Sequence, residues 1–258
     1  MSTQQEPIVA GYNPSFEDQE RVDRMTLLVA AVGCDGIVLA ADKTFLDLPE
    51  EDEEIDERLD GRKIIVLENH KVAYAFAGDY VSQLVGKKLK QILDSGAFQF
   101  KNIDQGLKDA ADAAISAEWM NNHALNVQAK RKLLVALYGE QVGQLQLWSV
   151  DIKVSMFSSA ERINGLVMTG ARGNAARFFR HYFQYNLPME RLKFLAAHIV
   201  LAGHSWNGDI DGLDMVLVGE TSGLKWPEES GKIVFRERFR QWDDITRNFL
   251  LDTTLRPA

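Results

Sequence analysis

The chain of 258 residues is 46% apolar and 26% charged, which is typical of a soluble globular protein, and its apolar runs are far shorter than the ~20 residues of a membrane helix. Nine acids and one arginine in residues 47–60 account for the whole net charge of −8, so the remainder is formally neutral and offers no basic face for nucleic acid. One cysteine excludes an intramolecular disulfide framework, and no basic start followed by an apolar stretch marks a secretory signal, so we expect a cytoplasmic protein.

The first part of the chain predicts a leader and two β-hairpins. Residues 1–25 are polar, contain two prolines and show no periodicity, so we interpret them as a leader. Two apolar runs follow, Leu27–Val32 and Ile37–Ala41, and the glycines and aspartate between them favour a tight turn. The acidic segment that comes next is interpreted as a solvated loop. Lys63–Leu67 and Val72–Ala77 then predict a second hairpin.

Beyond Gly78 the apolar residues change to a helical period. The spacing predicts helices over roughly 81–93 and 103–121. Strands are expected at 132–140, 143–151 and 164–170, with a weaker one at 154–157, and then two helices at roughly 174–183 and 189–202. A strand at 213–220, a closing strand at 231–237 and a tail from about 240 complete the chain.

The order of these elements predicts the fold class. No Gly/Ser linker or internal repeat divides residues 26–258, so we expect a single domain. The strands are joined largely by hairpins and not by β-α-β crossovers, which favours antiparallel sheets. Two such sheets packed face to face, with a helix pair outside each, would bury every apolar face. The sequence therefore predicts an α+β protein with a four-layer αββα sandwich.

Three polar residues are expected to meet at one edge of this sandwich. Thr26 opens the first strand, and Asp42 ends the strand that returns beside it. Lys63 stands where the chain enters the second hairpin. Each of these residue types is common at the end of a strand, so their spacing by itself is only weak evidence for a functional site.

Together, these residues suit nucleophilic catalysis. Cleavage of the peptide bond before Thr26 would give this residue an α-amine with a pKa of ~7.7–8.0, able to take the hydroxyl proton directly or through a water. Lys63 would favour the developing alkoxide, and Asp42 would hold Lys63 charged and oriented. The backbone N–H of Gly78, at the end of an apolar strand, would be open to a substrate carbonyl as an oxyanion donor.

The segments TLLVAAVGCDGIVLAAD, GRKI and KVAYAFAG together resemble the catalytic β-subunits of the 20S proteasome and their simpler bacterial counterpart, which are N-terminal-nucleophile hydrolases. Thr26 falls on the nucleophilic threonine of that family, Asp42 follows at the family's spacing, and Lys63 falls on the catalytic lysine. Gly78 falls on the glycine of the oxyanion hole. The element order matches over roughly residues 26–220.

The resemblance implies an Ntn-hydrolase fold and a leader removed by self-cleavage. It further implies assembly into homo-oligomeric rings and hydrolysis of polypeptide substrates, with an ATPase unfoldase as a candidate partner. No cofactor or metal is expected. His204 lies near two aspartates, but it lacks a further His or Cys at zinc spacing.

The surroundings of the three residues depart from the family. Met25 stands where self-processing members usually have glycine, and Ala171 replaces a serine that supports the terminal amine. Asp209 and Asp211 both fit the supporting aspartate, and we place Asp209 first. The leading hypothesis is a threonine-type endopeptidase with Thr26 as its nucleophile. The alternatives are a catalytically silent, unprocessed structural subunit and an amidase acting on a small amide.

Overall fold

The computed structural model describes residues 26–43, 63–121, 125, 127, 129–139, 143–154, 157–170, 182–184, 186–206, 212–219, 223–227 and 229–251. The leader, the acidic segment 47–60 and nearly all of the helix expected at 174–183 lie outside these ranges.

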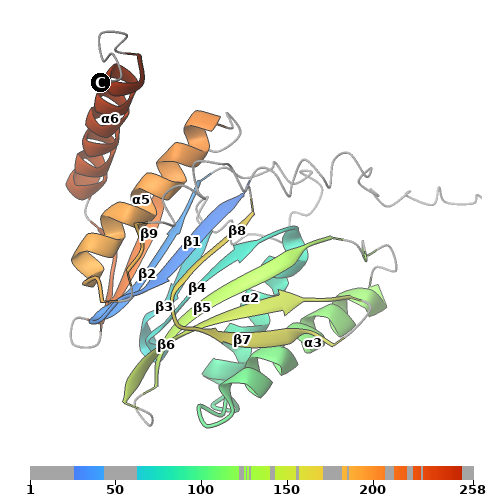
Figure 1. Ribbon diagram of the computed structural model, residues 1–258. Coiled ribbons are helices and arrows are strands. Elements are labelled where there is room, and N and C mark those ends of the chain that lie inside the picture. Colours follow the sequence, from blue (N-terminus) through green and yellow to red (C-terminus); the bar gives the residue numbers. More distant parts are fainter. Residues whose placement is uncertain are drawn as a thin grey trace, which may run out of the picture.

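Ten strands form two antiparallel five-stranded sheets within the described ranges (Figure 1). The first sheet has the order β10-β9-β2-β1-β8, with β1 Leu27–Val32, β2 Gly36–Ala41, β8 Leu166–Gly170, β9 Asp214–Gly219 and β10 Gly223–Lys225. The second has the order β3-β4-β5-β6-β7, with β3 Ile64–Leu67, β4 Val72–Ala77, β5 Arg131–Gly139, β6 Gln144–Ile152 and β7 Ser159–Ile163. A short 3-10 turn, Glu68–His70, joins β3 to β4. Both predicted hairpins are confirmed.

Helices cover the outer faces of both sheets (Figure 1). On the second sheet these are α2, Tyr80–Asp94, and α3, Ile103–Asn121. On the first sheet α5, Met189–Trp206, packs directly on β1 and β2, and α6, Glu229–Leu251, lies against α5. None of the helices in the described ranges has both the length and the apolarity that crossing a membrane requires.

Three apolar layers hold the elements together, which confirms the predicted αββα sandwich. Along β1, Leu28 and Ala30 point into the layer between the sheets, whereas Leu27, Val29 and Ala31 point toward α5. Both faces of this strand are therefore buried. Such a strand appears in the sequence as a continuous apolar run and not as an alternating one.

The predicted closing strand at 231–237 and the tail from about 240 are wrong, because both regions belong to α6. The run Ile233–Phe235 has strand-like composition, but Ile233 and Val234 are 51% and 41% exposed. Phe235, Phe239 and Trp242 instead form one helical face that packs on α5. The tertiary partner thus overrides the local propensity.

One edge of the second sheet also differs from the prediction. The weak strand expected at 154–157 is not found at the described residues of that stretch, and β7 lies further along the chain. The residues of β7 are mostly polar and form the edge of the sheet, so they carry little of the alternation that would reveal a strand. The short edge strand β10 was not predicted for a similar reason.

The contact between α5 and α6 contains a half-buried histidine, His198. Burial lowers the pKa of His198. The Phe194 carbonyl, 2.7 Å from Nδ1, raises this pKa through a hydrogen bond, whereas the positive charge of Arg238 in α6 lowers it further. The ring of His198 also contacts Phe239 and Trp242 of α6.

We expect the domain to lose stability as pH falls below the ordinary histidine range. Since the folded pKa is lowered, the unfolded chain takes up a proton that the folded chain resists, so the stabilisation is complete only above the unfolded pKa of about 6.5. Thermal unfolding of the wild type and His198→Gln across this range measures the effect. An equally steep pH dependence in both proteins would contradict the assignment to His198.

Candidate active site

Thr26, Asp42 and Lys63 meet at one end of the two sheets, as the sequence predicted. The Lys63 Nζ donates to Asp42 Oδ2 at 2.7 Å and to Thr26 Oγ1 at 3.3 Å. All three residues are buried, with exposed fractions of 8% for Thr26, 0% for Asp42 and 4% for Lys63. The structure brings together residues from three separate strand ends, and their catalytic roles stay predictions.

The backbone of each sheet fixes this arrangement. In the first sheet, the Leu27 N–H donates to Asp42 Oδ1 at 2.8 Å, and the Asp42 N–H donates to the Leu27 carbonyl at 3.2 Å. In the second sheet, the Phe76 N–H donates to the Lys63 carbonyl at 3.3 Å, which ties the start of β3 to β4. The Lys63–Asp42 ion pair therefore bridges the two sheets at their edge.

Burial and charge act in opposite directions on Lys63. Desolvation lowers the pKa of Lys63 from its ordinary value, whereas the carboxylate of Asp42 opposes this shift through its charge and its hydrogen bond. The net effect is a lowered pKa, which brings the amine closer to exchanging a proton with the threonine hydroxyl beside it.

Gly78 follows β4 with a φ of +114°, a conformation that side chains other than glycine rarely adopt. A Cβ there would lie 2.8 Å from the Lys130 carbonyl oxygen and 3.1 Å from the Arg131 Cα, so the backbone is closely packed behind it. Along a strand, N–H groups two residues apart point to the same side. The N–H of Gly78 is therefore directed like that of Phe76, toward the side of β4 on which Lys63 lies.

Gly170, at the end of β8, is a site residue that sequence reasoning did not single out. It pairs with Leu27 across β1 and has a φ of +90°. A Cβ at this position would lie 1.7 Å from the carbonyl oxygen of Thr26. Glycine is thus required for β8 to approach Thr26. The available signal in the sequence was a lone glycine at the end of an apolar run.

A second buried carboxylate was also missed. Asp214 opens β9 and pairs with Ala41, the residue before Asp42. Val216 and Val218 of the same strand point into the layer between the sheets, and strand alternation places Asp214 on that face. The predicted support by Asp209, its alternative Asp211, and the departures at Met25 and Ala171 lie outside the described residues.

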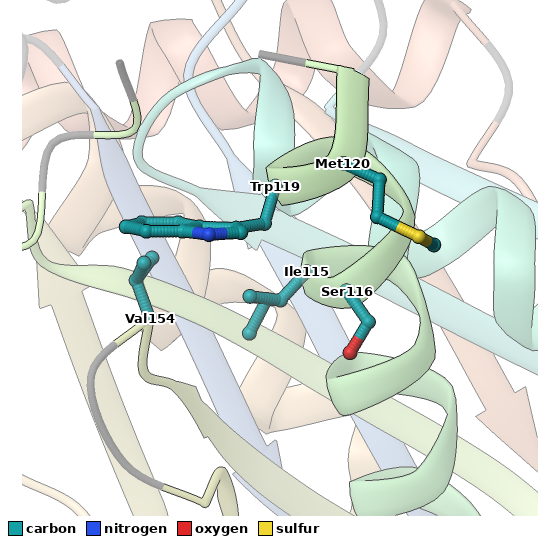
Figure 2. Close-up of a pocket in the computed structure, with 5 residues that line it drawn as sticks. All are labelled: Ile115, Ser116, Trp119, Met120 and Val154. Atoms are coloured by element: carbon teal, nitrogen blue, oxygen red, sulfur yellow. The ribbon is translucent and has the colours of Figure 1, made fainter. Parts of the chain in front are cut away.

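A pocket of about 390 Å³ lies elsewhere, at the C-terminal end of α3 (Figure 2). Its lining residues are Ile115, Ser116, Trp119, Met120 and Val154, none of which belongs to the site above. Figure 2 shows the Trp119 indole above Val154 and Met120 turned away from both. Within the described ranges, no group of three or more His, Cys, Asp or Glu is placed to hold a metal ion.

Comparison with known proteins identifies the fold. No family model and no curated protein matches the chain. Among solved structures, the helical assembly of the Anbu complex from Pseudomonas aeruginosa matches with a TM-score of 0.69 at 15% identity, covering 90% of this chain and 98% of that one. Anbu from Yersinia bercovieri, described as an ancestral beta-subunit, matches at 0.66 and 13% identity, covering 90% and 100%. Anbu from Hyphomicrobium sp. strain MC1 matches at 0.63 and 13%, with the same coverage.

This chain shares the Anbu fold. The family suggested by the resemblance, the 20S proteasome β-subunits, is wrong, because the three structures above are Anbu proteins, which are proteasome-like but form a distinct family. The four-layer fold predicted from the sequence is confirmed by the same likeness.

We expect Lys63→Met to lower the free energy of unfolding by about 3–5 kcal/mol, because it deprives the buried Asp42 carboxylate of its counter-charge. Adding Asp42→Asn should recover most of this loss, since the amide oxygen still accepts from Leu27. Denaturant unfolding of the two single variants and the double variant measures the coupling. The exposed pair Lys90–Asp94 is the control, where Lys90→Met should cost far less because solvent screens the charges. If the double variant is no more stable than Lys63→Met alone, the unpaired charge of Asp42 is not the cause of the lost stability.

Gly170→Ala should destabilise the fold by more than about 2 kcal/mol, because its Cβ overlaps a backbone oxygen that no rotamer change can move. Gly96→Ala is the matched control: Gly96 also has a positive φ, of +70°, but a Cβ there would meet nothing within 4 Å. Thermal unfolding compares the two variants. A similar loss in both would mean that the φ angle, and not the contact with Thr26, decides the requirement for glycine.

Proposed function

We propose that this protein hydrolyses peptide bonds with Thr26 as an N-terminal nucleophile, released when the bond between Met25 and Thr26 is cut. The observation that carries the proposal is the buried hydrogen-bonded chain from Thr26 Oγ1 through Lys63 Nζ to Asp42 Oδ2. The glycine N–H directed toward the same edge adds an oxyanion donor. The shared Anbu fold supports an assembly setting, since one Anbu complex is described as a helical assembly.

The proposed reaction follows from these positions. Thr26 Oγ attacks the carbonyl carbon of a substrate peptide, and its proton passes to an amine at the site, either the new α-amine or Lys63 Nζ. The oxyanion accepts a hydrogen bond from Gly78 N–H. The C–N bond then breaks as the proton moves to the leaving amine, and water hydrolyses the ester left on Thr26.

Release of the leader needs a base other than the α-amine. Before cleavage the nitrogen of Thr26 is an amide, so it cannot take the hydroxyl proton. Lys63 Nζ, at 3.3 Å from the hydroxyl and with its pKa lowered by burial, fits this role. Thr26 Oγ would attack the Met25 carbonyl carbon, and the C–N bond would break as the proton moves from Lys63 to the Thr26 nitrogen, which leaves an ester and a free α-amine. Water would then hydrolyse the ester to the Met25 carboxylate and the Thr26 hydroxyl.

We further propose that the active form is an assembly of copies of this chain acting on polypeptide substrates in the cytoplasm. An ATPase unfoldase would unfold folded substrates and deliver them as extended chains. The helical assembly described for the Pseudomonas aeruginosa protein supports association between copies, and the single cysteine fits a reducing compartment.

The intact mass of the purified protein tests the proposal. We expect a loss that matches residues 1–25, an adduct on Thr26 with a threonine-directed peptide epoxyketone, and cleavage of fluorogenic peptide amides. Thr26→Ala should abolish all three results. Ser149→Ala, which removes another buried side-chain hydroxyl from a β-strand, is the control and should leave them intact.

The alternative is a catalytically silent subunit that keeps its leader, and Met25 in place of glycine is the observation that favours it. A side chain there hinders the strained turn that self-cleavage requires. Full-length mass in the assembled particle, together with no epoxyketone adduct, would establish this alternative and overturn the peptidase proposal.

A further inference from the structure

We propose that Ser82 is a positioning residue for the oxyanion donor, with the Arg131–Asp79 ion pair holding the same turn from the other side. The inference rests on the proposed function and deepens it. It concerns residues outside the Thr26, Asp42 and Lys63 cluster, and no feature of the sequence pointed to them.

Ser82 acts on the peptide unit that carries the Gly78 N–H. This buried residue lies in the first turn of α2, and its Oγ donates to the carbonyl oxygen of Ala77 at 3.0 Å. The Ala77 carbonyl and the Gly78 N–H belong to one trans peptide, in which the two groups point in opposite directions. A hydrogen bond that holds the carbonyl toward α2 therefore turns the N–H away from α2.

The Arg131–Asp79 pair fixes the next residue along the chain. Arg131 opens β5, and its side chain is only 1% exposed. Its Nε donates to Asp79 Oδ1 at 2.6 Å, and its Nη2 donates to Asp79 Oδ2, so the contact is bidentate. Such a pair restricts orientation as well as distance. The residue that follows Gly78 is thus held against a neighbouring strand.

Asp79 also joins this turn to α2. It is the N-cap of the helix, where Oδ1 accepts from the Val81 N–H at 3.2 Å and its carbonyl accepts from the Ser82 N–H at 3.0 Å. These contacts place the Ser82 hydroxyl over Ala77. The turn between β4 and α2 is therefore held by the strand behind it and the helix above it.

The support matters because an oxyanion donor must lie within about 2.7–3.1 Å of the developing charge. Gly78 has no side chain of its own to restrict its backbone, and its φ of +114° lies in a region open to glycine. Ser82 and Arg131 restrict the backbone at Gly78 through their contacts with the residues on either side of it, Ala77 and Asp79. Loss of either should loosen the donor without altering the nucleophile.

The test compares Ser82→Ala and Arg131→Lys with matched controls in the processed protein. We expect Ser82→Ala to lower kcat about tenfold with little change in KM, because the donor acts mainly on the transition state. Affinity for a peptide boronate, which forms a tetrahedral adduct, should fall by a similar factor. Ser116→Ala removes an exposed helical hydroxyl that also donates to a backbone carbonyl. Lys132→Met breaks the partly exposed ion pair of Lys132 with Asp151. Both controls should leave kcat and boronate affinity unchanged.

Hydrogen exchange over residues 76–82 gives a readout that does not depend on turnover. Exchange should be faster in Ser82→Ala and Arg131→Lys than in the wild type and the controls. If the wild type is neither processed nor active, the proposed function fails, and exchange alone decides the positioning role. Unchanged exchange, or unchanged kcat and boronate affinity in an active protein, would overturn the inference.

Discussion

The buried ion pair between Lys63 and Asp42 is the interaction on which the rest of the site depends. It joins two sheets that pack on each other through an apolar layer, and it holds the threonine hydroxyl through the same ammonium group. A buried ion pair contributes little net stability, because desolvation of both charges offsets their attraction. Apolar residues of similar volume could hold this edge equally well. The pair is therefore better explained by proton chemistry than by stability.

Two separate sets of contacts fix the backbone and side chains at this end of the sheets. Asp42 uses one carboxylate oxygen to fix the backbone of β1 and the other to hold Lys63, so strand pairing and ammonium placement are set together. On the second sheet, the turn after β4 is held by Ser82 and by the Arg131–Asp79 pair. The proposed nucleophile and the proposed oxyanion donor thus come from separate sheets, and packing between the sheets fixes their separation.

Likeness to Anbu proteins at 13–15% identity extends over 90% of the chain. At this level of identity the layers and their connections are shared, whereas most side chains differ. Activity therefore has to be argued from the site itself. The geometry of Thr26, Lys63 and Asp42 supports the proposed hydrolase, and the proposed release of Thr26 depends on Met25.

The sequence by itself determined the sandwich, the two hairpins and the clustering of Thr26, Asp42 and Lys63, because apolar period and strand ends are local properties. It failed for α6, where the run Ile233–Phe235 has strand-like composition and only packing against α5 selects the helix. Gly170 gave only the signal of a lone glycine after an apolar run, and Ser82 and Arg131 gave none, because each matters through a contact with a residue distant in sequence or across a turn. Only the tertiary structure decided these roles, because a local sequence pattern does not identify the residue that a side chain contacts.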